Sequence, residues 1–280
     1  MVGIESKANV CTENINAASN VLSISVVVPV FNQVHFTERC LGSLLDNSIL
    51  ARELVIIDNN SSDSTPTVLK EFQNRFADKG WSMHIISNPG NIGFGRACNQ
   101  GIRASSGAFV VILNNDTWLM PGWDKVLVRR IDELKADMIA PYYDETPFDE
   151  IGTPIQAKRF VARNRNRYSK DWVSILMFFR RKTLDDIGVF DERFFVTYED
   201  TDLRERMVRA GKRYFQVGDC YIWHFSKGTR DSQKLPSDYE QKGLRLFTEK
   251  WGFDPRVPHN TTVAKFRRKW KRIKARMGLF

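Results

Sequence analysis

Cysteine is scarce in this sequence: the 280 residues contain four, at positions 11, 40, 98 and 220, and no two form a CxxC pair. This spacing excludes a zinc cluster and a disulfide framework and predicts a reducing compartment. Long apolar runs are also missing, because nowhere do about 18 apolar residues follow one another, so no membrane-spanning segment is expected. Residues 1–20 lack the apolar core of a signal peptide. We therefore expect a cytoplasmic protein.

Acidic residues are missing from residues 255–280, which contain nine Lys or Arg. The formal net charge of the whole chain is +9, so residues 1–254 carry as many basic as acidic side chains. A nucleic-acid groove would spread its charge through the folded body, which makes nucleic acid the weaker expectation. Residues 260–280 place apolar side chains on one helical face, at Val263, Phe266, Trp270, Ile273 and Met277. This tail predicts contact with an anionic membrane; a solvated helix, a subunit contact or a phosphate-binding arm are the alternatives.

Glycine is missing from residues 31–33, the loop after the first expected strand, where a dinucleotide-binding fingerprint would lie. Gly93 and Gly95 have the spacing of that fingerprint, but Cys98 stands at its third glycine. A Rossmann dehydrogenase is therefore excluded. We expect these glycines to allow close packing of a helix on the sheet and a close backbone approach to a ligand. Arg96, the next residue, suits a phosphate and solvent equally.

The chain does contain an alternation of short apolar runs and amphipathic segments. Strands are expected at residues 21–30, 54–57, 84–87 and 109–113, and helices at residues 37–50, from 65 onward and at 94–104. This alternation is typical of an α/β fold with a mostly parallel, Rossmann-like sheet flanked by helices.

The second half is less regular. We expect a helix at residues 123–134, a strand at 138–140, a variable loop at 142–170 and a strand at 173–179. A helix that begins near Glu199 buries Leu203 and Met207, turns Asp202 toward solvent and ends at Gly211. Two short strands follow, at 214–217 and 220–224.

Polar side chains follow two of the expected strands. Asp58 ends the second strand, and Asn114, Asn115 and Asp116 follow the fourth. Ligands of open α/β sheets bind at the carboxyl ends of strands, and carboxylate and amide oxygens suit a divalent cation that bridges to a diphosphate. Ordinary turns, in which Asn and Asp are common, are the alternative.

Two further candidates lie nearer the C-terminus. His224 ends an apolar strand, where a neutral imidazole could bind a metal or simply be structural. Glu199 and Asp200 stand at the start of a helix, where acids favour the macrodipole or where one of them acts as a general base.

Five motifs occur in an order that resembles the family-2 glycosyltransferases of GT-A fold, and most of all their rhamnosyltransferase-like bacterial members. The resemblance spans about residues 23–229. The motifs are VVVPVFN (26–32), VIIDNNSSD (55–63), NIGFGRACN (91–99), LNNDT (113–117) and YEDTDL (198–203).

The resemblance implies an inverting enzyme that moves a hexose or deoxyhexose from a UDP-, dTDP- or GDP-linked donor to an acceptor hydroxyl. The site residues that it implies for the nucleotide sugar are Pro29, Asn32, Asp58, Arg96, Asn99, Asn114, Asn115 and Asp116. Asp116 and His224 would hold Mg²⁺ or Mn²⁺, and Asp200 would be the catalytic base with Glu199 beside it. Asn114 replaces the first acid of the family's DxD motif, which leaves metal dependence open. We expect Asp171, Trp172 and the loop 142–170 at the acceptor.

The implied organisation is a polar segment (1–21), a glycosyltransferase domain (22–254) and the basic tail (255–280). The domain divides into a nucleotide-binding half (22–120) and an acceptor-binding half (121–254). The implied acceptor is a glycan or lipid-linked glycan of bacterial cell-surface polysaccharide or glycolipid synthesis, reached from a peripheral position on the inner face of the membrane. A nucleic-acid or protein acceptor, and a non-catalytic nucleotide-sugar-binding module, are the alternatives.

Overall fold

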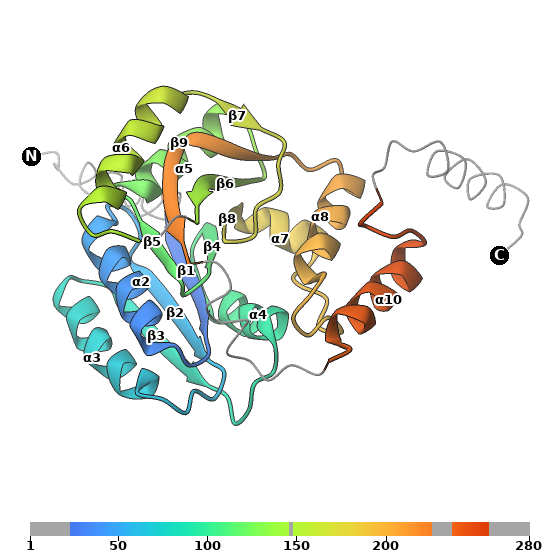
Figure 1. The fold of residues 1–280 in the computed structure, drawn as a ribbon, viewed down its shortest axis with the longest axis horizontal. Coiled ribbons are helices and arrows are strands. Elements are labelled where there is room, and N and C mark those ends of the chain that lie inside the picture. The colour runs from blue at the N-terminus through green and yellow to red at the C-terminus, as the bar shows by residue number, and fades with distance from the viewer. Residues whose placement is uncertain (1–22, 146–147, 226–236, 258–280) are drawn as a thin grey trace, which may run out of the picture.

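The computed structural model describes residues 23–145, 148–225 and 237–257 (Figure 1). Its strands are β1 (Ile24–Val30), β2 (Glu53–Asp58), β3 (Ser82–Ser87), β4 (Phe109–Leu113), β5 (Thr117–Leu119), β6 (Met138–Asp144), β7 (Tyr168–Ser169), β8 (Leu176–Arg180) and β9 (Tyr214–His224). Its helices are α2 (Val34–Asn47), α3 (Thr65–Asp78), α4 (Phe94–Ala104), α5 (Trp123–Glu133), α6 (Gly152–Asn164), α7 (Arg181–Ile187), α8 (Glu199–Arg209) and α10 (Tyr239–Trp251). The strands form one sheet in the order β3-β2-β1-β4-β8-β6-β9-β5, with β7 paired to β9. The expected α/β class, a central sheet flanked by helices, is confirmed.

The first four strands form a parallel block. β1 lies between β2 and β4, and β2 continues to β3. β1 and β4 are buried along their whole length, as apolar parallel strands covered by helices are. α4 packs on β1 and β2, and α3 packs on β3. The strands and helices expected in this half are confirmed, with small shifts in their bounds.

The second half of the sheet is mixed, so fewer pairings are parallel than expected. β8 runs antiparallel between β4 and β6, while β6 and β9 are parallel and β5 and β7 pair antiparallel with β9. β9 is one strand rather than the two short strands expected. Its register jumps from Pro141–Val217 to Tyr142–Tyr221, so the strand continues past a bulge. The bulge contains residues 218–219, a Gly-Asp pair that is a turn signal in sequence.

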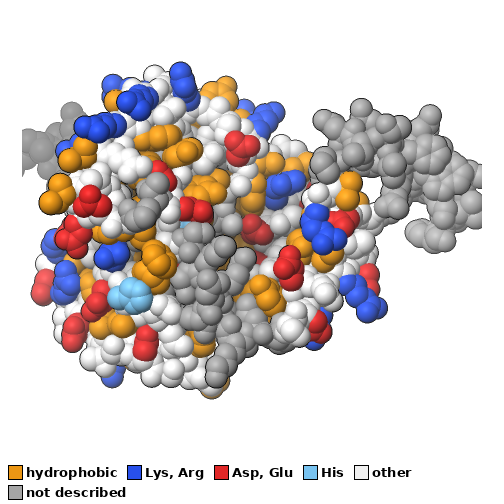
Figure 2. All heavy atoms as spheres, in the orientation of Figure 1, with side chains coloured by type: hydrophobic (Ala, Val, Ile, Leu, Met, Phe, Trp, Pro, Cys, Tyr) orange, Lys and Arg blue, Asp and Glu red, His pale blue; other side chains and the backbone are white. Residues whose placement is uncertain are grey.

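Residues 152–164 form a helix, α6, where the sequence predicts part of a variable loop. Only Thr153 and Ala157 of this helix are buried. A helix with so narrow a buried stripe shows little apolar periodicity, which is why the sequence pattern does not reveal it. Lys and Arg side chains gather along the upper edge of Figure 2, over the region where Figure 1 draws α6. The pattern also does not predict α7 and α10.

The described part of the chain contains three of the four cysteines and the helices discussed above. No helix there is long and apolar enough to cross a bilayer. Cys40, Cys98 and Cys220 are buried free thiols. Burial raises the pKa of the Cys40 thiol to about 12 and that of Cys98 well above its usual value, so both stay protonated and are poor nucleophiles. The segment 1–21 and the apolar and basic faces expected at 260–280 lie outside the described residues.

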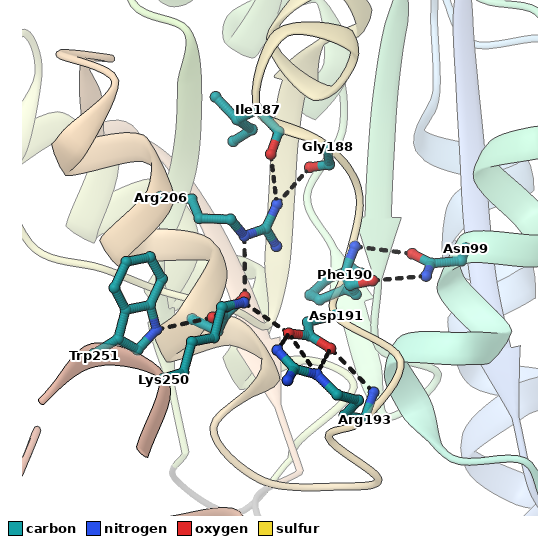
Figure 3. A network of polar contacts seen from close by, with 10 residues as sticks. Asn99, Ile187, Gly188, Phe190, Asp191, Arg193, Arg206, Lys250 and Trp251 are labelled. Carbon is teal, nitrogen blue, oxygen red and sulfur yellow. Dashed lines mark hydrogen bonds and ion pairs between the residues drawn. The ribbon is translucent and has the colours of Figure 1, made fainter. Parts of the chain in front are cut away.

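Asp202 is fully buried, which corrects the expectation that it faces solvent. Its carboxylate accepts hydrogen bonds from Arg206 Nε at 3.0 Å and from Trp251 Nε1 at 2.9 Å, and it lies 2.6 Å from Lys250 Nζ. The cause is α10, which the sequence pattern does not predict and which brings Lys250 and Trp251 against α8 (Figure 3).

Lys250 and Arg206, which contact Asp202, also contact the loop that precedes α8. Lys250 Nζ lies 2.7 Å from Asp191 Oδ2, and Arg193 hydrogen-bonds the same carboxylate (Figure 3). The hydrogen bonds from Arg193, with that from Lys250, hold the pKa of Asp191 below its usual range. Arg206 Nη1 donates to two backbone carbonyls at residues 187–188, at 2.8 and 2.7 Å. The loop is therefore fastened to both α8 and α10.

The close packing of α4 on the sheet makes Gly101 intolerant of a side chain. A Cβ at this position would overlap Val27 Cγ1 and come within 2.6 Å of Ile57 Cδ1. We expect Gly101→Ala to lower the free energy of unfolding by about 2 kcal/mol because the strands cannot move aside. Urea denaturation measures the change. Gly42→Ala is the matched control in α2, where a Cβ meets nothing within 4 Å, and should be neutral or slightly stabilising.

Asp202→Asn should destabilise the protein by about 3 kcal/mol. The substitution keeps the shape of the side chain but removes the buried negative charge that faces Arg206 and Lys250, of which only Lys250 keeps a second carboxylate, that of Asp191. The same denaturation measurement on Asp46→Asn gives the control, because the exposed ion pair of Asp46 with Lys79 is worth at most about 1 kcal/mol. Equal losses in the two variants would contradict a structural role for the buried carboxylate.

Candidate functional site

The loops after β1 and β2 are joined by side-chain hydrogen bonds that bring Asn32 and Asp58 together. Asn32 has a left-handed backbone with φ of 53°, and its Oδ1 accepts a hydrogen bond from Ser62 N at 2.7 Å. Its own backbone N donates to Ser61 Oγ at 2.7 Å. The buried Asp58 accepts a hydrogen bond from Ser61 N at 2.9 Å through Oδ1. One Ser-Ser turn thus holds both predicted nucleotide residues, with Pro29 buried in β1 beneath them.

Asp116 and His224 lie side by side, as the sequence interpretation requires of two ligands of one metal. β5 and β9 pair antiparallel with Thr117 opposite His224, so the residue before Thr117 falls beside the imidazole. Asp116 Oδ1 is 3.3 Å from His224 Nε2, and both side chains are largely buried. The backbone carbonyl of Asp116 also accepts a hydrogen bond from Phe225 N at 2.9 Å. The pairing of these two strands therefore sets the separation of the two groups.

Asn114 and Asn115 face different surroundings. Asn115 is buried, and its Nδ2 donates to Thr37 Oγ1 of α2 at 3.0 Å. Asn114 is anchored by its backbone N, which donates to Ile175 O at 3.0 Å. Its side-chain Oδ1 is buried and has no hydrogen-bond partner among the described residues. Asn115 therefore ties the β4–β5 connection to α2, while Asn114 presents a desolvated oxygen that a cation or a donor group would satisfy.

Glu145 is a neighbour of this pair that the sequence interpretation missed. Its Oε1 lies 3.5 Å from His224 Nδ1, and its side chain is 47% exposed. β6 runs to Asp144, which pairs with Trp223 of β9, and this brings the following residue beside His224. The sequence predicts that β6 ends at Ala140, so it gives no reason to place Glu145 here. The imidazole lies between two carboxylates.

These residues fit a divalent cation that is shared with a substrate. Among the described residues no group of three or more His, Cys, Asp or Glu side chains forms a metal cage. Asp116 and His224 offer one carboxylate and one imidazole, and Asn114 has an unsatisfied buried oxygen. Mg²⁺ and Mn²⁺ commonly take one or two protein ligands and complete their shell with phosphate oxygens and water. The donor set therefore suits a metal that arrives with a diphosphate.

Glu199 and Asp200 open α8 next to the start of α4. Glu199 is buried, and a Cβ at Gly95 would lie 3.7 Å from its Cβ. Phe94 N donates to Phe195 O at 3.0 Å, so the loop before α8 lies against the N-terminus of α4. Asp200 is half-buried and accepts a hydrogen bond from Thr201 Oγ1 at 3.2 Å. Gly93 and Gly95 thus allow close packing against the loop before α8, whereas the sequence predicts that they pack a helix on the sheet.

Arg96 and Asn99 contact the α8 loop, although the resemblance implied that they bind the nucleotide sugar. Asn99 is fully buried, and its amide donates to Phe190 O and accepts from Phe190 N, each at 2.9 Å (Figure 3). Its Nδ2 also donates to Glu192 Oε1 at 3.0 Å. Arg96 Nε donates to Glu192 O at 3.0 Å. Both side chains fasten α4 to the loop, and a contact with the nucleotide remains a prediction.

The predicted acceptor residues differ in exposure. Asp171 is exposed, whereas Trp172 packs against the main core with its ring edge-on to Tyr214 at a centroid distance of 5.2 Å. The indole Nε1 of Trp172 is buried without a hydrogen-bond partner among the described residues. Trp172 is therefore partly a core residue. A role in acceptor binding remains a prediction for both Asp171 and Trp172.

Two bacterial glycosyltransferases are similar in sequence to part of this chain. A glycosyltransferase named GlyA from Streptococcus pneumoniae is 28% identical over 121 residues, which is 43% of this chain and 17% of that protein. The GalNAc(5)-diNAcBac-PP-undecaprenol beta-1,3-glucosyltransferase of Campylobacter jejuni is 28% identical over 110 residues, 39% of this chain and 35% of that protein. The chain thus spans less than two thirds of these relatives' length.

The fold is shared with solved enzymes. The mannosyltransferase PcManGT from Pyrobaculum calidifontis, crystallised with GDP-Man and Mn²⁺, superposes with a TM-score of 0.56 at 15% identity and covers 80% of this chain and 69% of its own. This likeness shows the GT-A type of fold. The sequence model of the family described as Glycosyl transferase family 2 matches residues 25–195, more than half of the chain. The chain therefore belongs to glycosyl transferase family 2.

Proposed function

We propose that this chain is an inverting glycosyltransferase that moves a hexose or deoxyhexose from a UDP-, dTDP- or GDP-linked donor to an acceptor hydroxyl. The observation that carries the proposal is the pair Asp116–His224, 3.3 Å apart at the carboxyl end of the sheet, near the loops that hold Asn32 and Asp58. A solved neighbour binds GDP-Man with Mn²⁺, which supports the same ligand classes here. Residues 22–120 would supply the nucleotide site and residues 121–254 the acceptor site.

Each predicted site residue would have a separate role in binding or catalysis. Asp58 and Asn32 would bind the nucleoside, while Asp116, His224 and Asn114 would face the diphosphate. A bound Mg²⁺ or Mn²⁺ would neutralise negative charge that develops on the departing diphosphate. Asp200 would take the proton from the acceptor hydroxyl, whose oxygen attacks the anomeric carbon on the side opposite the diphosphate. Glu199 would contact the acceptor or substitute for the base.

The proposed acceptor is a glycan or a lipid-linked glycan of bacterial surface polysaccharide or glycolipid synthesis. The name of the Campylobacter relative specifies a glycan on an undecaprenyl diphosphate, which favours this class over a nucleic-acid or protein acceptor. A peripheral position at the inner face of the membrane would suit such an acceptor. One observation favours a second function, namely that Asn114 stands where the motif of the family has an acid. A weaker metal site would leave a module that binds a nucleotide sugar but does not transfer the sugar.

The donor site can be tested by thermal shift with UDP, dTDP, GDP and CDP, each with and without Mn²⁺. One nucleotide should raise the melting temperature of the wild type, because a ligand that binds only the folded state stabilises it. Asp116→Ala should lose the part of the shift that needs Mn²⁺, and Asp58→Ala should lose most of the shift under both conditions. Asp46→Ala, on an exposed side chain of α2, should respond as the wild type does. Absence of any shift in the wild type would contradict the proposed donor site.

The catalytic role of Asp200 can be tested with the nucleotide sugar whose base that experiment identifies. Asp200→Asn should lower kcat for sugar transfer or donor hydrolysis by at least about 100-fold, because the acceptor loses its general base. The KM for the donor should stay within about twofold, since Asp200 does not contact the nucleotide in this proposal. Glu199→Gln should reduce kcat less. The reverse ranking would make Glu199 the base, and donor binding without turnover in the wild type would favour the non-catalytic module.

A further inference from the structure

Residues 151–170 form a surface with an unusual charge composition, which we name the α6 surface. The segment contains six Lys or Arg and no Asp or Glu. All six side chains are exposed: Lys158, Arg159, Arg163, Arg165, Arg167 and Lys170. None of them forms an ion pair with another described residue, whereas exposed cations such as Arg129, Arg209 and Arg245 lie on carboxylates. The positive charge of the α6 surface is therefore not compensated within the described chain.

The α6 surface also exposes large apolar side chains. Ile151 is 77% exposed, Ile155 44% and Tyr168 56%. Ile151 and Ile155 are four residues apart, and Lys158 and Ala162 follow at spacings of three and four, so the four share one side of the helix. A single exposed aliphatic side chain is ordinary, but two exposed isoleucines one helical turn apart among unpaired cations form a mixed apolar and basic surface, as on a helix that lies in a membrane interface.

We propose that the α6 surface docks onto a membrane that contains anionic phospholipids. Lipid headgroups would compensate the six cations, and the acyl boundary would accept Ile151 and Ile155, which is the chemistry of a helix lying in the membrane interface. Nucleic acid would satisfy the cations but offers no site for exposed isoleucines. A protein partner would need a matched acidic and apolar face, whereas an anionic bilayer supplies both features everywhere on its surface.

The position of the α6 surface gives the docking a functional consequence. Tyr142 of β6 stacks on Phe160 of α6 at a centroid distance of 4.0 Å, and Gln156 Nε2 donates to Asp144 at 2.6 Å. The residue after Asp144 is Glu145, whose carboxylate is 3.5 Å from His224. A docked α6 would therefore hold the candidate site near the lipid surface, where a lipid-linked acceptor would reach it. This consequence depends on the proposed function, but the docking itself does not.

The test is co-sedimentation of the full chain with phosphatidylcholine vesicles prepared with and without phosphatidylglycerol. The wild type should bind only the anionic vesicles, and added salt should weaken binding. Lys158→Gln/Arg159→Gln/Arg163→Gln should lower the partition coefficient by about 100-fold, at roughly fivefold for each cation. Lys70→Gln/Arg75→Gln/Lys125→Gln removes the same charge from exposed positions on α3 and α5 and should bind as the wild type does.

A second variant separates insertion from charge attraction. Ile151→Ser/Ile155→Ser should weaken partitioning by about tenfold while the salt dependence persists, because the cations remain. Its melting temperature should match the wild type, since both side chains are exposed. An equal loss of vesicle binding in the Lys70/Arg75/Lys125 variant would overturn the proposal. Unchanged vesicle binding in the Lys158/Arg159/Arg163 variant would also overturn it, because residues 258–280 would then account for the binding. Binding of DNA that is lost in the Lys158 variant, with vesicle binding unchanged, would also overturn it.

Discussion

The parallel pairing of β1 with β2 and β4 is the constraint on which the candidate site depends. Val30 pairs with Asp58, and Val27 of β1 pairs with Ile112 of β4 as the last pair of that ladder. If that register is extended by three residues, Asn115 stands level with Val30. The strands below this level are apolar and buried. A slip of one residue would draw Asp58 or Asn115 into that interior and away from its hydrogen-bond partners, at a high desolvation cost. Burial of the apolar strands therefore fixes the register, and with it the position of the polar residues at the ends of the strands.

Sequence reasoning succeeds where burial leaves a strong pattern. β1, β2 and β4 are continuous apolar runs that end on Asn or Asp, so both the strands and the polar positions after them are predictable. It fails where burial is created by contacts distant in sequence. Asp202 looks like a surface acid until α10 covers it. Glu145 looks like part of a loop because the sequence pattern predicts that β6 ends at residue 140, whereas the strand continues along β9 to Asp144.

The loop before α8 shows how contacts outside the site position residues within it. From one side, Asn99 and Arg96 of α4 hold the backbone at residues 190–192. From the other side, Lys250 holds Asp191 while Arg206 holds residues 187–188. Glu199 and Asp200 follow this doubly fastened segment after residues 193–198. The NIGFGRACN motif, which looks like a ligand-binding loop in sequence, thus also has a structural task, the support of the α8 N-terminus.

In the proposed donor site, Asn114 in place of an acid would alter the electrostatics of the strand end in a definite direction. A site with one carboxylate fewer would attract a divalent cation less strongly, but it would also repel an incoming diphosphate less. Glu145 lies on the far side of the imidazole, half-exposed, so its charge is better screened than that of the largely buried Asp116. Cation and diphosphate would then bind most favourably together, because each supplies charge that the other needs. Strong mutual dependence of metal and nucleotide is what this arrangement of charges favours, in contrast to a preformed metal site that binds the cation alone.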